Sequence, residues 1–209
     1  MNRRDMLTKA ALAAPLVPAL FTPDSPGRAT RSVRGPRAAY FPNFILRTQD
    51  NKPVRFYDDL VQGKIVIFNF FYARCEDTCP ATMANLLRVQ ELLGDRVGRD
   101  YHMYSITLDP KHDTPRVLKE YALMHGAKPG WLFLTGRLDE IDVLRRKLGY
   151  ADPDPVRDKD KSRHIGVIRY GNEAMDRWAA CPVMMNPERV AESIHWMDFP
   201  KTWPGKTGA

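Results

Sequence analysis

The chain has 209 residues, of which 44% are hydrophobic, and it carries a formal net charge of +7. These values fit one globular domain and exclude a fibrous or disordered chain. The basic residues are scattered, without a basic helix or a basic stripe interleaved with aromatic residues, so we expect no nucleic-acid partner. Three cysteines are too few for a scaffold held together by disulfides.

The first residues predict an export signal. The paired Arg3 and Arg4 are followed by a leucine, a lysine and then a weakly apolar run, an order that is typical of a twin-arginine signal. The run is too short and too broken by prolines to span a bilayer, which takes roughly 20 apolar residues. The alternative is a basic amphipathic start without a targeting role. We assign residues 1–29 to this signal and therefore expect a periplasmic protein.

The mature chain is expected to hold one folded domain. Residues 30–39 are rich in proline, glycine, serine and arginine, which predicts a linker. The domain is predicted over residues 40–198, followed by a C-terminal tail at 199–209. Outside the reducing cytoplasm, two neighbouring thiols tend to oxidise or to hold a metal.

The domain begins with a predicted hairpin and a buried strand. Apolar stretches at 44–46 and 54–56 flank a turn at Asp50-Asn51, as in a short hairpin. Ile65–Phe71 is a continuous run of β-branched and aromatic residues, which fits a strand that is buried on both faces.

Helices and strands alternate after this strand. Apolar residues recur at helical spacing from Pro80 to Leu93, and Gly94 is a typical residue at which such a helix ends. Thr114 and Pro115 are typical of a helix start, as cap and first residue. The next expected elements are a strand at 101–108, a helix at 115–124, a strand at 131–134 and a helix at 138–148 closed by Gly149.

The end of the domain predicts a loop, a hairpin and a helix. Residues 151–162 are polar, charged and proline-bearing, which indicates a loop. Strands that alternate with helices indicate an α/β sandwich. The remaining expected elements are hairpin strands at 165–170 and 174–178, a turn between them at Gly171-Asn172, and a helix at 190–196.

Two cysteines lie where the buried strand gives way to a helix, in the stretch FFYARCEDTCPATM. A helix N-terminus favours a thiolate, and the spacing of Cys75 and Cys79 places both sulfurs on one side. They can chelate one soft cation or close a small disulfide, and the spacing, one residue longer than in CxxC, favours chelation. A purely structural disulfide or a pair of buried cysteines is the alternative, although the polar residues around the pair argue against deep burial.

A third ligand is needed, because two sulfurs leave a cuprous or zinc ion undersaturated. His164 is the best candidate, since it ends the polar loop and opens an apolar strand. One imidazole with two thiolates suits copper. A histidine at a strand start can also be an exposed residue without a role.

Five further residues raise the same kind of question. Asp109 and Asp113 could orient a ligand imidazole by accepting its spare N–H, or they could supply only turn and cap chemistry. Cys181, Met184 and Met185 are soft donors that could form a copper entry site, or they could fill the core.

The segments FNFFYARCEDTCPATMANL, SITLDPKHDTPRVLKEYA, LTGRLDEIDVLRRKLG and HIGVIRYGNE resemble the Sco/SenC family of copper-site assembly proteins. The resemblance implies a thioredoxin-like sandwich, in which helices flank a central mixed β-sheet. It also implies copper held by Cys75, Cys79 and His164, and the task of loading the copper centre of a respiratory oxidase or keeping it reduced. His112 stands where the family more often has another charged residue and could be a stray ligand.

The leading hypothesis is therefore a metallochaperone and not an enzyme in the strict sense. Oxidation of Cys75 and Cys79 to a disulfide would release the metal. The alternative is a thiol–disulfide reductase that acts on cysteines of a copper-site partner. A thiol peroxidase fits less well, since FFYAR before Cys75 lacks the peroxiredoxin pattern. We expect a monomer or weak dimer that meets a copper-receiving oxidase subunit.

Overall fold

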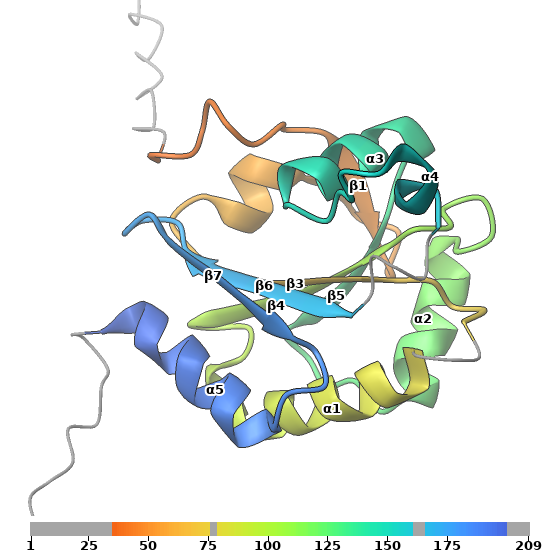
Figure 1. The fold of residues 1–209 in the computed structure, drawn as a ribbon. Helices are drawn as coiled ribbons and strands as arrows, with labels where there is room; N and C mark the ends of the chain where they lie inside the picture. Colours follow the sequence, from red (N-terminus) through yellow and green to blue (C-terminus); the bar gives the residue numbers. More distant parts are fainter. Residues whose placement is uncertain (1–34, 76–78, 161–165, 200–209) are drawn as a thin grey trace, which may run out of the picture. The chain divides into compact units, whose positions relative to one another are not determined.

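The computed structural model describes residues 35–75, 79–160 and 166–199 (Figure 1). Within these residues the strands form one mixed sheet of seven strands, in the order β2-β1-β5-β4-β3-β6-β7. The central pairs β3–β4 and β4–β5 are parallel, and the outer pairs are antiparallel. The strands are β1 (Ile45–Thr48), β2 (Pro53–Arg55), β3 (Ile65–Phe71), β4 (Tyr101–Thr107), β5 (Trp131–Thr135), β6 (Val167–Asn172) and β7 (Arg177–Pro182).

Helices cover both faces of the sheet, as predicted for an α/β sandwich. α1 and α5 lie side by side over one face, whereas α3 and α4 lie over the other (Figure 1). The helices are α1 (Cys79–Leu93), α2 (Pro115–Met124), α3 (Leu138–Lys147), α4 (Pro155–Asp158) and α5 (Pro187–His195), with a short π-helical segment η1 (Phe56–Val61) before β3.

β3 is the strand on which the core is built. Each of its seven residues is buried, because neighbouring strands flank it and helices cover both faces. Its register against β4 runs from Ile65 opposite Tyr101 to Phe71 opposite Thr107. The prediction of a strand buried on both faces is confirmed, and both central strands end together at one edge of the sheet.

The residues predicted to start and end helices have these roles in the structure. The Thr114 side chain caps α2 by accepting a hydrogen bond from the Val117 N–H, and Pro115 is the first helical residue. Gly149 has a φ of +76° directly after α3, a conformation that costs glycine little. These residues set the ends of the helices that flank the site described below.

The predicted turn of the second hairpin is wrong. Gly171 and Asn172 belong to β6, where they pair with Val66 and Ile65 of β3, and β7 begins only at Arg177. A Cβ on Gly171 would lie 2.4 Å from a ring atom of Trp178. The glycine therefore permits close packing across the hairpin, and the chain turns after it, with Asp176 at a φ of +50°.

The polar stretch predicted as a loop contains the short helix α4. Asp154 accepts a hydrogen bond from the Val156 N–H over 2.9 Å, and Pro155 is the first helical residue. An aspartate cap before a proline is a helix-start signal. The composition of the whole stretch obscured this signal.

Glu173 fastens the β6–β7 turn to the segment before β3, and we expect its removal to destabilise the fold. This buried carboxylate accepts hydrogen bonds from the Tyr57 hydroxyl over 2.7 Å and from the Gly63 N–H over 2.8 Å. Glu173→Ala leaves both donors without this acceptor, so the free energy of unfolding should fall by about 2 kcal/mol. Urea denaturation measures it, and exposed Glu120→Ala should change it by at most about 0.5 kcal/mol. Equal effects of the two substitutions would contradict this role for Glu173.

Candidate metal site

Cys75 lies in the connection between β3 and α1. Its backbone N–H donates to the Tyr72 carbonyl over 3.1 Å, and the residue is buried as part of the main core. The expectation of shallow burial, drawn from its polar neighbours, is therefore wrong for Cys75, because the turn at residues 72–74 directs it inward. α1 begins at Cys79, but the Cys79 side chain and residues 76–78 lie outside the described part.

Asp113 ties this connection to the end of β4. The carboxylate is fully buried, and its Oδ2 accepts hydrogen bonds from the Ala73 N–H, over 3.0 Å, and from the Thr107 hydroxyl. Thr107 ends β4 and is the register partner of Phe71, which ends β3. One carboxylate thus holds the backbone two residues before Cys75 against the ends of the two central strands.

Asp113 does not cap α2, since Thr114 has that role. Asp113 instead contacts an imidazole, and this imidazole belongs to His112: Nδ1 lies 2.9 Å from Asp113 Oδ1. In the tautomer that donates from Nδ1, the carboxylate fixes the ring and leaves Nε2 as the acceptor. The ring is partly exposed, so the structure places an accessible, oriented histidine beside the Cys75 connection.

Asp109 contacts the same connection between β3 and α1 through the largely exposed side chain of Arg74. Its Oδ2 accepts from Arg74 Nη2 over 2.8 Å, and its backbone N–H donates to the Thr107 hydroxyl oxygen over 2.9 Å. Most of the Arg74 side chain is exposed, so this ion pair is worth little in solution. Of the two aspartates, Asp113 is the one whose contacts are shielded from water.

His164 lies outside the described residues, so its approach to the thiols stays a prediction. The residues that follow it are described from Gly166 onward. β6 runs antiparallel to β3, with Arg169 opposite Phe68, so β6 starts at the edge of the sheet where β3 ends. Gly166, just before β6, accepts a hydrogen bond from the Val183 N–H over 3.0 Å.

On the N-terminal side of His164, a buried ion pair holds Asp158, which lies six residues before it in the sequence. Arg145 of α3 binds Asp158 through two contacts, Nη1–Oδ1 at 2.6 Å and Nη2–Oδ2 at 2.8 Å. The same carboxylate accepts from the Asp152 N–H over 2.8 Å and pairs with Arg146 at 2.7 Å. Hydrogen bonds from Arg145 hold the pKa of Asp158 well below its usual range.

The soft donors near the C-terminus fall into two groups. Cys181 is buried on β7, and burial raises the pKa of its thiol, so it is a core residue and a poor metal ligand. Met184 and Met185 are exposed by 61% and 38%, and the Asn85 amide of α1 donates to the Met185 carbonyl over 2.9 Å. The core interpretation therefore holds for the cysteine and not for the methionines.

Among the described residues, no group of three or more histidine, cysteine, aspartate or glutamate side chains is placed to hold a metal ion. Two of the three predicted ligand side chains are outside this set. No helix in the described part of the chain has the length and apolar character needed to cross a membrane.

Sequence reasoning missed two features of this region. The Arg145–Asp158 pair joins α3 to a stretch that the sequence predicts as a loop, and the Thr107 hydroxyl bonds to both Asp109 and Asp113. The pairing of adjacent arginines with an acidic stretch was visible as charge pattern, but nothing in the sequence selected Asp158 among its acidic neighbours.

Comparison with known proteins gives a consistent result. A family model described as SCO1/SenC matches residues 34–197. A SCO2-like protein of Rickettsia felis is 33% identical over 107 residues, which are 48% of this chain and 51% of the relative. The chain spans about half the length of the curated relatives it matches.

Two solved structures share the fold. Copper-bound ScoI of Bradyrhizobium japonicum has a TM-score of 0.57 at 24% identity and covers 74% of this chain and 96% of its own. BsSco, described as a member of the Sco family of cytochrome c oxidase assembly proteins with a disulfide switch, has a TM-score of 0.59 at 22% identity and covers 72% and 88%. These likenesses confirm the predicted thioredoxin-like sandwich.

Proposed function

This chain belongs to the SCO1/SenC family, and on that premise we propose that it is a copper-binding assembly factor for a respiratory oxidase. The observation that carries the proposal is the placement of Cys75, which is buried where β3 meets α1 and is braced by the Asp113 carboxylate. The copper bound to the B. japonicum protein and the assembly role given for BsSco support it.

Copper is the cargo in this proposal, and three side chains bind it. Cys75 and Cys79 each lose a proton and bind as thiolates, and neutral His164 supplies a nitrogen. Two soft sulfurs and one imidazole are a donor set that suits copper. Three ligands leave the ion open to attack by the thiols of a receiving subunit, so it can be transferred by stepwise ligand exchange.

The redox state of the two thiols controls release. Thiol–disulfide exchange with a disulfide oxidant joins Cys75 and Cys79 as a disulfide, which no longer binds the ion, and the oxidant takes the two electrons and leaves as a dithiol. The disulfide switch named for BsSco supports this step. The chain acts in the periplasm, reached through the twin-arginine signal of residues 1–29, as a monomer or weak dimer.

We expect removal of the thiol pair to abolish copper binding. The full chain, reduced and loaded with cuprous ion in competition with a chelator, should bind one ion, and the Cys75→Ala, Cys79→Ala double variant should bind at least a hundredfold more weakly. Cys181→Ala is the matched control, because that thiol is buried on β7, and it should bind like the wild type. Unchanged stoichiometry and affinity in the double variant would end the proposal.

A thiol–disulfide reductase is the second candidate, favoured by the placement of Cys75 before a helix start and by the switch in BsSco. His164→Ala separates the two functions. A copper carrier loses most of its affinity for cuprous ion in this variant. A reductase keeps most of its rate with a disulfide substrate, because the imidazole takes no part in the exchange.

A further inference from the structure

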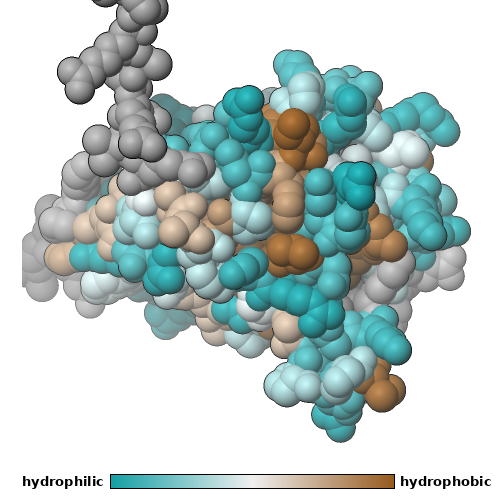
Figure 2. Space-filling view, turned by 90° about the horizontal axis from the view of Figure 1, so that it is seen from above, coloured by the Kyte–Doolittle hydropathy of each residue, from teal (hydrophilic) through white to brown (hydrophobic). Residues whose placement is uncertain are grey.

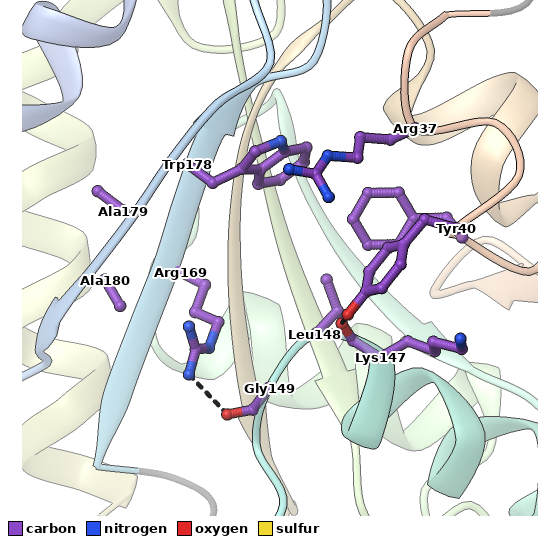
Figure 3. Close-up of a pocket in the computed structure, with 10 residues that line it drawn as sticks. Arg37, Tyr40, Lys147, Leu148, Gly149, Arg169, Trp178, Ala179 and Ala180 are labelled. Carbon is purple, nitrogen blue, oxygen red and sulfur yellow. Dashed lines mark hydrogen bonds between the residues drawn. The ribbon is translucent and has the colours of Figure 1, made fainter.

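A cavity of about 280 Å³ lies between the β6–β7 hairpin, the end of α3 and the chain segment before β1 (Figure 3). It shares no lining residue with the candidate metal site. Its volume lies just below the range of about 300–1,000 Å³ that is usual for ligand pockets. Its charged lining residues are Arg37, Lys147 and Arg169, and its aromatic ones are Tyr40, Phe41 and Trp178.

Arg169 brings an uncompensated positive charge to this cavity. Its Nη2 donates to the Gly149 carbonyl over 2.6 Å, as the dashed line in Figure 3 marks, and its Nε is buried without an acceptor. Within the described part of the chain, Arg169 forms an ion pair with no carboxylate, and neither does Lys147. A charge held in this way in a half-buried place favours an anion.

Arg37 adds a second guanidinium on the opposite wall, where Figure 3 shows it reaching toward Trp178. Its Nε pairs with Asp176, outside the lining. The Lys147 ammonium lies 4.8 Å from the centre of the Tyr40 ring and adds to the positive potential. The cavity therefore has three cations around it and no acidic residue in its lining.

Aromatic rings form the rest of the wall. The Phe41 ring packs against Trp178 at a centroid distance of 5.3 Å and against Tyr40 at 5.0 Å. Ala179 and Ala180 of β7 have small side chains, which leave space in front of the rings. An apolar, planar group has a surface to pack on here, next to the guanidinium of Arg169.

We propose that this cavity binds a small carboxylate with an aromatic body. The carboxylate accepts from Arg169 and Arg37, and the ring packs on the wall that Tyr40, Phe41 and Trp178 form. The negative charge of the ligand matches Arg169, which lines the cavity and has no carboxylate partner among the described residues. The volume admits about one ring, so the carboxylate belongs to a free small molecule or to the C-terminal aromatic residue of a peptide.

Phenylacetate is the probe, and the indole N–H of Trp178 is the reporter, observed by ¹H–¹⁵N NMR of the full chain. We expect a saturable shift with a dissociation constant on the order of 1 mM. Phenylacetamide, which has the same shape without the charge, should bind at least tenfold more weakly. Equal binding of acid and amide, or a shift that does not saturate, would overturn the proposal.

Two variants test the guanidinium groups separately. Arg169→Gln and Arg37→Gln should each weaken phenylacetate binding at least fivefold. The Arg37 side chain is partly exposed, so Arg37→Gln should fold normally. It therefore keeps the test valid if Arg169→Gln fails to fold. Arg116→Gln is the matched control, because that arginine is exposed on α2, and it should bind like the wild type. Unchanged binding in both pocket variants would overturn the assignment.

A peptide arm identifies the source of the carboxylate. An acetylated tripeptide that ends in phenylalanine is compared with its C-terminal amide. A peptide acid that binds tenfold more tightly than phenylacetate supports a protein C-terminus as the ligand. A peptide acid that binds more weakly than phenylacetate supports a free small molecule. Binding of the peptide amide as tight as that of the acid contradicts carboxylate recognition in either form.

Discussion

Asp158→Asn is expected to destabilise the fold by about 3 kcal/mol, with a fall in Tm of roughly 10 °C. The substitution removes the carboxylate that neutralises Arg145, and the arginine stays buried in its place. Arg145 keeps a contact with Asp142 at 2.7 Å, which limits the loss. Urea denaturation at pH 7 gives the free energy of unfolding directly.

The loss of stability caused by Asp158→Asn should become smaller as the pH falls. Hydrogen bonds from Arg145 lower the pKa of Asp158 in the folded chain, whereas an unfolded aspartate titrates near about 3.9. The carboxylate thus contributes stability that is complete above that value and is lost as the pH falls toward the folded-state pKa. The difference between wild type and Asp158→Asn should therefore be largest near pH 7 and shrink steadily below pH 4.

An exposed ion pair provides the control. Asp139 pairs with Arg137 at 3.0 Å with both side chains mostly exposed, so Asp139→Asn should leave the unfolding transition unchanged. Asp158→Asn should also weaken copper binding, because α4 leads into the stretch that contains His164. A difference between wild type and Asp158→Asn that stays constant from pH 7 to pH 3 would show that Asp158 is not the group responsible.

Elements set by local chemistry could be predicted from the sequence. β3 is an unbroken apolar run, and the bounds of α2 follow from Thr114 and Pro115, so both appear where expected. The β6–β7 turn was misplaced because a Gly-Asn pair has two uses. Local preference favours a turn, but pairing with β3 and packing of Trp178 on Gly171 keep the pair in a strand. Such a competition is decided by tertiary contacts.

In the candidate site, too, some features follow from local sequence and others depend on tertiary contacts. The position of Cys75 between a buried strand and a helix followed from the junction of an apolar run with Cys79-Pro80. The support that Asp113 gives to this connection could not be predicted in this way, because Asp113 and its partner Ala73 are 40 residues apart in the sequence. A carboxylate before Thr-Pro has the signature of a local cap, and only the parallel pairing of β3 with β4 brings it to the Cys75 connection. The thiol–imidazole contact with His164 remains a prediction.

The brace suggests how the chain holds a reactive thiol in a defined place. The turn before Cys75 belongs neither to β3, which ends at Phe71, nor to α1, which begins at Cys79. Its backbone is instead bonded to a carboxylate fixed by Thr107 at the end of a central strand. Rigid placement of a ligand before the metal arrives lowers the cost of binding. It follows that Asp113 should affect Cys75 without touching copper.

Asp113→Ala is expected to destabilise the fold by about 2–4 kcal/mol, because the partly buried Ala73 N–H and the buried Thr107 hydroxyl lose their acceptor. It should also open the Cys75 connection locally. In metal-free, reduced protein under native conditions, alkylation of Cys75, located by mass spectrometry, should be at least tenfold faster than in the wild type. Asp113→Asn keeps one acceptor oxygen and should fall between the two.

Asp109→Ala is the matched comparison. It removes a carboxylate from the same connection, but its partner Arg74 is largely exposed, so alkylation of Cys75 should rise less than threefold. Cys181 serves as an internal reference for global unfolding, since it is buried on β7, which β6 separates from β3. A rise at Cys75 with none at Cys181 identifies local opening. Equal rises at both thiols in Asp113→Ala, or equal rates at Cys75 in the two aspartate variants, would remove Asp113 as the brace of the thiol.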